Sequence, residues 1–218
     1  PTGRGTLEPL GRAGQLNIPA TYIHCNNLSD TEWKMIADSG GTVSVSPQVE
    51  LNMGHGIPVT QLALDHGIRP SLSVDVETSL PGDFFTQMRV AVAVQRGLSF
   101  ERTRLGEKNV PPPMTARAAL EFATVEGARA NGLLHKTGTL TPGKQADVVM
   151  LRADRINVLP VNDPVGAVVQ GMDTSNVDTV IVAGRVRKRG GHLVGVETSR
   201  ARSLVQASQS YLVTRANT

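Results

Sequence analysis

The chain has 218 residues, of which 39% are hydrophobic and only 3% aromatic, so its core must be built from aliphatic side chains. That composition favours helices packed on a mostly parallel sheet, whose buried strands are rich in Val, Leu and Ile. The 22 basic and 19 acidic residues leave a formal net charge of +3, too small and too scattered to indicate nucleic-acid binding. No run of about 18 apolar residues is present, which argues against a membrane partner. Because the only cysteine cannot form an internal disulfide and no secretory signal is found, we expect a cytoplasmic protein.

The first elements alternate between strand and helix. Residues 1–18 are rich in Gly, Arg and polar side chains and predict an irregular lead-in. Residues 20–25 form a β-prone run that reaches His24 at its end. Ser29, with Glu32 three positions later, forms a capping box that predicts a helix of about three turns.

Two further strands and a helix follow. The run TVSVS at 42–46 predicts a strand, PVTQLALDHG at 58–67 predicts a helix with Pro in its first turn, and RPSLSVD predicts a strand that ends at Asp75. This β-α-β-α-β order, with strands about 25 residues apart, predicts a parallel sheet covered by helices because crossover connections are right-handed.

The pattern changes beyond Asp75. A long helix is predicted for about 83–96, and after a proline-rich break Thr115 caps a helical pair. A strand at 146–151 and the hairpin VDTVIVAGRVRKRGG then indicate a β-rich unit. We therefore predict four parts, in which the C-terminal helix docks on a surface. They are a lead-in (1–18), a parallel α/β unit (19–136), a β-rich unit (137–195) and a helix (196–218).

Polar side chains follow all three predicted parallel strands. They are His24, then Glu50 and His55 in the SPQVELNMGHG loop, then Asp75 and Glu77. Because the carboxyl ends of parallel strands meet at one edge, these residues are expected to converge. A carboxylate there can ligate a divalent ion and accept a proton, and an imidazole can ligate or donate to a developing anion. The residues alone leave open a structural interpretation, in which Asp75 is an N-cap or Asx-turn carboxylate and His24 only satisfies its ring nitrogens at the strand end.

Four segments then occur in a characteristic order. They are YIHCNNLSDTEWKMIADSGGTVSVSP, GHGIPVTQLALDHGIRPSLSVD, MTARAALEFATVEGARANGL and TGTLTPGKQADVVML. Together they resemble the C-terminal half of the amidohydrolase superfamily, in the branch of cytosine deaminases and triazine hydrolases (chlorohydrolases). That branch removes amino or halide substituents from N-heterocycles by attack of metal-activated water.

The resemblance implies an α/β fold: the C-terminal part of a distorted (β/α)8 TIM barrel, about strands six to eight, followed by part of a small β-sandwich domain. It implies that His24 closes strand six and contacts the substrate, and that Asp75 closes strand eight, ligates the metal and shuttles a proton. Glu50, His55 and Glu77 would bind a small heterocyclic substrate. One divalent metal ion, zinc in preference to iron, would serve the full-length enzyme.

Most of the metal ligands of this family have no counterpart in the sequence. The family carries an H-x-H pair on its first strand and another histidine on its fifth, but none of the five histidines here forms such a pair. A catalytic divalent ion normally needs three or more protein ligands. We therefore expect a fragment that is inactive alone and that associates with a missing N-terminal half or forms a homo-oligomer.

Two alternatives to the deaminase or chlorohydrolase hypothesis stay open. A relative that opens amide or cyclic imide rings would share the same strand ends, because loops set specificity. A catalytically inactive remnant or binding module would keep the half barrel by pairing with another chain. A nucleotide-binding domain is disfavoured, because no Gly-rich strand-to-helix turn is present.

Overall fold

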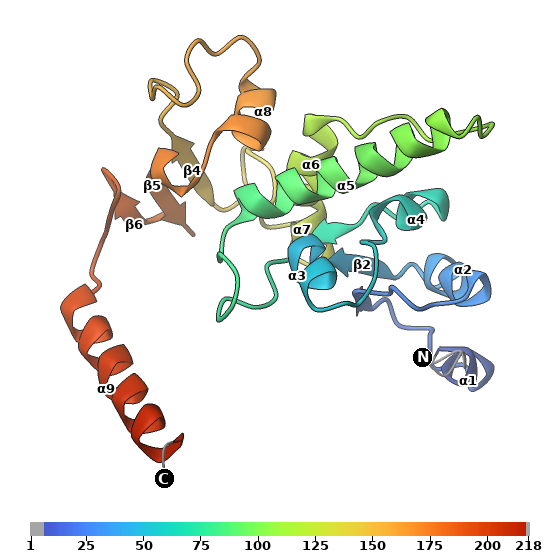
Figure 1. The fold of residues 1–218 in the computed structure, drawn as a ribbon, viewed down its shortest axis with the longest axis horizontal. Helices are drawn as coiled ribbons and strands as arrows, with labels where there is room; N and C mark the ends of the chain where they lie inside the picture. The colour runs from blue at the N-terminus through green and yellow to red at the C-terminus, as the bar shows by residue number, and fades with distance from the viewer. Residues whose placement is uncertain (1–6, 217–218) are drawn as a thin grey trace.

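The computed structural model describes residues 7–216 and contains two separate sheets (Figure 1). The first is a three-stranded parallel sheet in the order β1-β2-β3, and the second is a four-stranded antiparallel sheet in the order β4-β5-β6-β7. The fold is therefore α/β, as predicted. Within residues 7–216, none of the helices is both long and apolar enough to traverse a bilayer.

The parallel sheet and its helices come first in the chain. Their bounds are α1 Glu8–Arg12, β1 Thr21–Ile23, α2 Asp30–Asp38, β2 Thr42–Val45, α3 Pro47–Asn52, α4 Thr60–Asp65 and β3 Ser71–Leu72. Thr21 pairs with Thr42 and Ser44 pairs with Ser71, both in parallel register. The β-α-β-α-β order predicted from the spacing of the strands is confirmed.

The start of α2 follows the capping box in the sequence. Ser29 Oγ accepts a hydrogen bond from the Glu32 backbone N–H at 3.2 Å, and the Glu32 carboxylate accepts one from the Ser29 N–H at 2.9 Å. Trp33 and Ile36 on the inner side of the helix are buried in one cluster with Val43 of β2. This cluster packs α2 and α4 against the outer face of the sheet and holds the strands rigidly in place.

The next helices pack against β3. They are α5 Phe84–Arg104, α6 Ala116–Phe122 and α7 Val125–Ala130, and Asp83 and Thr115 cap the first two. The helix α5 extends to Arg104, beyond the predicted end near residue 96, because no proline interrupts it before the PPP run. Its buried side chains share one apolar cluster with β3, α6 and the segment after α8. The members are Leu72, Met88, Ala91, Val92, Met114, Ala119, Phe122 and Val169.

The antiparallel unit and a last helix complete the described chain. Their bounds are β4 Val148–Leu151, α8 Pro164–Gly166, η1 Ala167–Gly171, η2 Thr174–Asn176, β5 Val177–Val182, β6 Arg185–Arg189, β7 His192–Leu193 and α9 Thr198–Ala216. β5 and β6 form the predicted hairpin, with positive φ at both turn residues, Ala183 and Gly184. The described residues place these strands in one sheet, so the β-sandwich and the domain boundaries stay predictions.

Two sequence predictions near the first strands are wrong. The lead-in is not wholly irregular, because Glu8–Arg12 form α1, in which Glu8 pairs with Arg12 one turn later; residues 1–6 lie outside the described part. The SPQVELNMGHG segment is not only a loop, because Pro47–Asn52 form α3. Pro47 suits the first turn of a helix, where its missing N–H costs nothing.

The prediction that the C-terminal helix docks on a surface is also wrong. All described side chains of α9 are exposed, and the helix extends away from the rest of the chain (Figure 1). Its larger apolar residues, Leu204, Val205, Tyr211, Leu212 and Val213, spread over roughly 200° of the helix circumference at 100° per residue. A helix without a narrow apolar stripe has no single face to bury.

The capping box gives a test of local stability. We expect Ser29→Ala to lower the free energy of unfolding by about 1 kcal/mol, because it removes the acceptor for the Glu32 N–H. Urea denaturation measures the change. Ser203→Ala on α9 is the matched control, since it also removes a serine hydroxyl from a helix, but one that donates to the Ser199 carbonyl inside the helix and caps no helix start. Equal effects of the two substitutions would contradict the role of the cap.

Candidate active site

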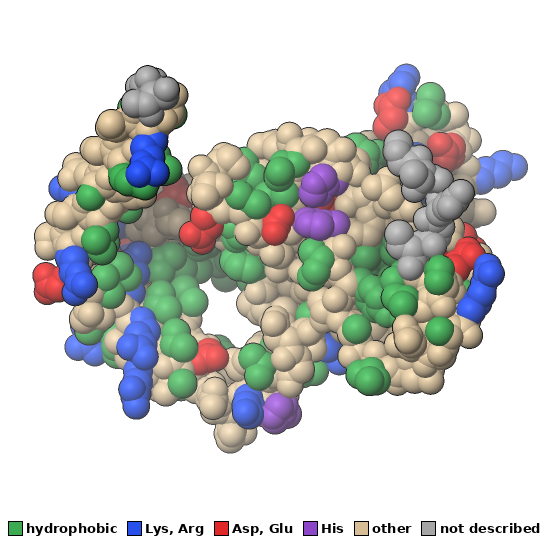
Figure 2. Space-filling model, turned by 90° about the horizontal axis from the view of Figure 1, so that it is seen from below, with side chains coloured by type: hydrophobic (Ala, Val, Ile, Leu, Met, Phe, Trp, Pro, Cys, Tyr) green, Lys and Arg blue, Asp and Glu red, His purple; other side chains and the backbone are tan. Residues whose placement is uncertain are grey.

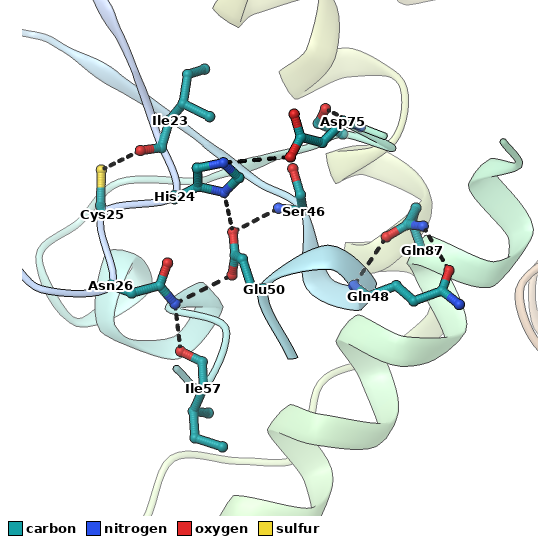
Figure 3. A network of polar contacts seen from close by, with 11 residues as sticks. Ile23, His24, Cys25, Asn26, Ser46, Gln48, Glu50, Ile57, Asp75 and Gln87 are labelled. Atoms are coloured by element: carbon teal, nitrogen blue, oxygen red, sulfur yellow. Dashed lines mark hydrogen bonds and ion pairs between the residues drawn. The ribbon is translucent and has the colours of Figure 1, made fainter. Parts of the chain in front are cut away.

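Polar side chains from the ends of all three parallel strands meet at one imidazole. His24 follows β1 and Asp75 follows β3, and His24 Nε2 lies 3.6 Å from Asp75 Oδ2 (Figure 3). His24 Nδ1 lies 3.1 Å from Oε1 of Glu50, which belongs to α3 directly after β2. The ring of His55 contacts the His24 ring edge-on, with centroids 4.9 Å apart. Figure 2 shows two adjoining histidine side chains in the middle of one face, with acidic side chains nearby.

The Glu50 carboxylate lies beneath the His24 ring. Its side chain is 0% exposed, whereas those of His24 and Asp75 are 26% and 33% exposed. Glu50 Oε1 also accepts the backbone N–H of Ser46 at 2.8 Å, and Oε2 lies 3.5 Å from Asn26 Nδ2. Protein groups therefore surround this carboxylate in the described chain, and the part of Glu50 in substrate binding stays a prediction.

The other two predicted binding residues line cavities. His55 is half-buried and borders, with His24 and Asn26, a cavity of about 450 Å³. Glu77 lies with Asp75 beside a second cavity of about 700 Å³ over the inner face of the sheet. The Glu77 side chain folds over Gly82, where an added Cβ would lie 2.7 Å from Glu77 Oε1.

Backbone strain concentrates at the same edge of the sheet. Within residues 7–216, positive φ occurs at five non-glycine residues, and three of them are here: His24 at 66°, Cys25 at 64° and Asp75 at 65°. Each such residue costs about 1 kcal/mol or more and persists only where the surroundings hold it. Backbone hydrogen bonds run up to these turns, from the His24 N–H to Ser44 O at 3.0 Å and from the Ser73 N–H to Val45 O at 2.9 Å. Clustered strain of this kind is typical of functional sites.

Asn26 and Ser46 also belong to the site, although sequence reasoning did not single them out. Asn26 Nδ2 donates to Ile57 O at 3.0 Å as well as facing Glu50, so it ties the loop after β1 to the loop after α3. Asn26 lies in the HCNN segment directly after His24, a position that could have suggested a part in the site. Ser46 contributes only its backbone N–H, which donates to Glu50 Oε1, and no feature of the sequence predicts that contact.

The described residues do not form a complete metal centre. Among residues 7–216, no group of three or more His, Cys, Asp or Glu side chains is arranged to hold a metal ion. Asp75 presents a partly exposed carboxylate to the cavity and suits a single ligand position. One carboxylate is not enough to hold a divalent ion.

Comparison with known proteins places the chain. Residues 3–187 match the amidohydrolase family. The chain belongs to this family. It is 31% identical over 201 residues to the 5-methylthioadenosine/S-adenosylhomocysteine deaminase of Acetivibrio thermocellus, a match that covers 92% of this chain and 44% of that enzyme. The chain therefore spans less than half the length of the curated relatives it matches.

Solved structures agree in fold. The adenosine deaminase of Xanthomonas campestris with bound zinc superposes with a TM-score of 0.84 at 21% identity, over 98% of this chain and 47% of that one. The atrazine chlorohydrolase of Arthrobacter aurescens complexed with zinc gives a TM-score of 0.78 at 22% identity, over 91% and 42%. The predicted resemblance to the deaminase and triazine hydrolase branch, over part of longer proteins, is confirmed.

Cys25, next to His24, is protected from ionisation. Its side chain is buried in the cluster behind the sheet, and burial, with a smaller contribution from the Glu50 charge, raises the pKa of the Cys25 thiol from 9.0 to about 12. The left-handed turn at His24 and Cys25 thus brings the imidazole to Glu50 and Asp75, while Cys25 packs into the core cluster. Cys25 is consequently a structural residue and no nucleophile at neutral pH.

The thiol gives a test that needs no substrate. At pH 8 we expect iodoacetamide to modify the folded chain about 1000-fold more slowly than the urea-unfolded chain, because three pKa units separate the two thiols. The ratio of the two labelling rates should stay large as the pH rises to 9 and fall only above pH 9, where the unfolded thiol is already ionised. The free energy of unfolding should depend on pH in the same range. The raised pKa of the folded thiol contributes stability that is fully present below pH 9 and is lost between pH 9 and about 12, where the unfolded thiol ionises first. Rapid labelling of the folded chain at pH 8 would refute the burial of Cys25.

Proposed function

We propose that this chain is part of a metal-dependent hydrolase that removes an amino or halide substituent from an N-heterocycle. The convergence of His24 and Asp75 at 3.6 Å, on the carboxyl edge of a parallel sheet, carries the proposal. The family membership supports hydrolysis, and the relatives are named as deaminases and chlorohydrolases, which release ammonia and chloride respectively. The first sheet would be strands six to eight of a barrel, and the second would be part of a β-sandwich.

Asp75 would supply one ligand to a divalent ion, with the others contributed by a part of the protein beyond this chain. Two structural neighbours are described with zinc, which favours zinc over iron. When bound, such an ion supplies hydroxide at neutral pH by lowering the pKa of water from about 16 towards about 7. The described residues do not complete this centre, so the steps below concern only the side chains that are present.

Asp75 and His24 divide the handling of protons. The Asp75 carboxylate is the more exposed of the two that flank His24, so it can accept a proton from a nucleophilic water and pass it to the leaving group. His24 Nε2 points to the same place and can donate to the atom that gains charge. A well-placed donor of this kind contributes about 3 kcal/mol of transition-state stabilisation.

The first test separates the two roles. In the intact protein we expect Asp75→Asn to abolish nearly all turnover and to reduce the bound metal, because it removes both the ligand charge and the proton acceptor. We expect His24→Ala to lower turnover by roughly 100- to 1000-fold with metal content retained. Ammonia and chloride release from aminated and chlorinated purines, pyrimidines and triazines measures turnover, and elemental analysis measures the metal.

Two exposed residues away from the site serve as matched controls for these substitutions. Asp38→Asn at the end of α2 and His135→Ala in the loop after α7 should change neither measurement. Full activity in either site variant would remove that residue from the mechanism. Ring opening of a cyclic imide, without release of ammonia or chloride, would favour the amide hydrolase alternative instead.

The sheet edges give a second test, on partners. In the described residues β1 and β3 each pair only with β2, so both outer edges of the parallel sheet are open, and Ile23 of β1 is 53% exposed. Open, partly apolar edges promote association. We therefore expect residues 1–218 alone to sediment as oligomers, and Ile23→Lys to shift them towards monomer.

Ile156→Lys is the control for the edge test, because Ile156 is 92% exposed in a loop after β4 and far from either open edge in sequence. An equal shift with this variant would show a general effect of charge. If residues 1–218 instead form a monomer with a sharp melting transition, the proposal that the half barrel needs a partner is wrong.

A further inference from the structure

The buried Glu50 carboxylate lies at the Nδ1 edge of the His24 ring, 3.1 Å away, and the proposed function gives it no role. We propose that Glu50 is a positioning residue, which fixes the tautomer and the ring orientation of His24. The role deepens the proposed function, because it concerns how the imidazole of that same site is prepared for the reaction.

The hydrogen-bond pattern around Glu50 determines which nitrogen of His24 carries hydrogen. Glu50 Oε1 accepts the Ser46 N–H at 2.8 Å, and an ionised carboxylate has no hydrogen of its own to donate. The 3.1 Å contact between Glu50 Oε1 and His24 Nδ1 therefore requires the hydrogen to be on Nδ1. In the neutral ring, Nε2 is then left with its lone pair, on the side of the ring that faces Asp75 (Figure 3).

This arrangement leaves Nε2 as the nitrogen that can act on a substrate. The hydrogen on Nδ1 stays with Glu50, so Nε2 is the nitrogen from which His24 would donate to the atom that gains charge, while Asp75 passes the proton of the water to the leaving group. With both nitrogens protonated, the Nδ1–H would donate to Glu50, and Nε2 would lie within ion-pair distance of the Asp75 carboxylate. The edge-on contact with His55 and the left-handed φ of His24 restrict the ring further.

A purely structural role for Glu50 is the competing explanation. Glu50 lies in the first turn of α3, and its bond to the Ser46 N–H would stabilise the start of that helix even without His24. A change in the free energy of unfolding would not distinguish helix stabilisation from positioning of His24, so the protonation of the imidazole nitrogens must be measured directly.

Long-range ¹H–¹⁵N NMR of the ¹⁵N-labelled intact protein identifies the tautomer of His24, because the two neutral tautomers of histidine give different pairs of ring nitrogen chemical shifts. We expect His24 of the unsubstituted protein to be the Nδ1–H tautomer, with an Nδ1 hydrogen protected from solvent exchange. Glu50→Gln keeps a carbonyl acceptor and should preserve that tautomer, whereas Glu50→Leu removes the acceptor and should yield a mixture. Turnover should fall about 10- to 100-fold in Glu50→Leu, in kcat more than in KM, with most of it restored in Glu50→Gln.

Glu126→Gln is the matched control, because Glu126 is also a buried carboxylate in an ionic network, with Arg69 and Arg129, at the opposite end of the sheet. It should lower stability without altering the His24 signals. An Nε2–H tautomer in the unsubstituted protein overturns the proposal even if no variant folds, and so does an unchanged tautomer in Glu50→Leu. A changed tautomer with unchanged turnover supports positioning by Glu50 and contradicts the catalytic role of His24.

Discussion

The site depends on a mutual requirement between a buried carboxylate and the imidazole above it. Glu50 is fully enclosed, and a buried carboxylate without hydrogen-bond donors costs several kcal/mol. His24 supplies one of its donors and the Ser46 N–H another. Each partner therefore fixes the other, and the chain at the ends of β1 and β2 must adopt the one arrangement that brings them together.

The sheet makes this arrangement possible at an acceptable energetic cost. Left-handed backbone at His24, Cys25 and Asp75 is unfavourable for residues with side chains, yet each turn is anchored by ladder hydrogen bonds that continue to the strand end. Behind the strands, buried Trp33 and Ile36 hold the outer face. Stability gained in the core thus supports strained geometry at the edge, where the chemistry is proposed to occur.

The sequence predicted those features that local patterns encode. Strand and helix order followed from spacing, and the caps at Ser29 and Thr115 marked two helix starts, because capping is a short-range interaction. The convergence of His24 and Asp75 followed from strand direction alone. Whether Glu50 faces a cavity or the core was beyond the sequence, because α3 is too short for its periodicity to be recognised and its rotation is set by packing. The exposure of α9 was missed because residues 196–218 were taken as an amphipathic helix, and an amphipathic helix is expected to dock by its apolar face.

The unequal burial of the two carboxylates divides their chemistry. The Glu50 side chain has no exposed surface and contacts the His24 ring, so the proposed positioning role acts through that ring. The Asp75 side chain is one-third exposed and borders the larger cavity, so it can exchange protons with whatever occupies that space. A ring held between an inaccessible acceptor and an accessible one is polarised in a single direction: its Nδ1 hydrogen stays in the protein, and only Nε2 is available to a substrate. If Glu50 were the exposed carboxylate and Asp75 the buried one, the ring would be oriented equally well. Nε2 would then face the buried carboxylate and could not reach a substrate.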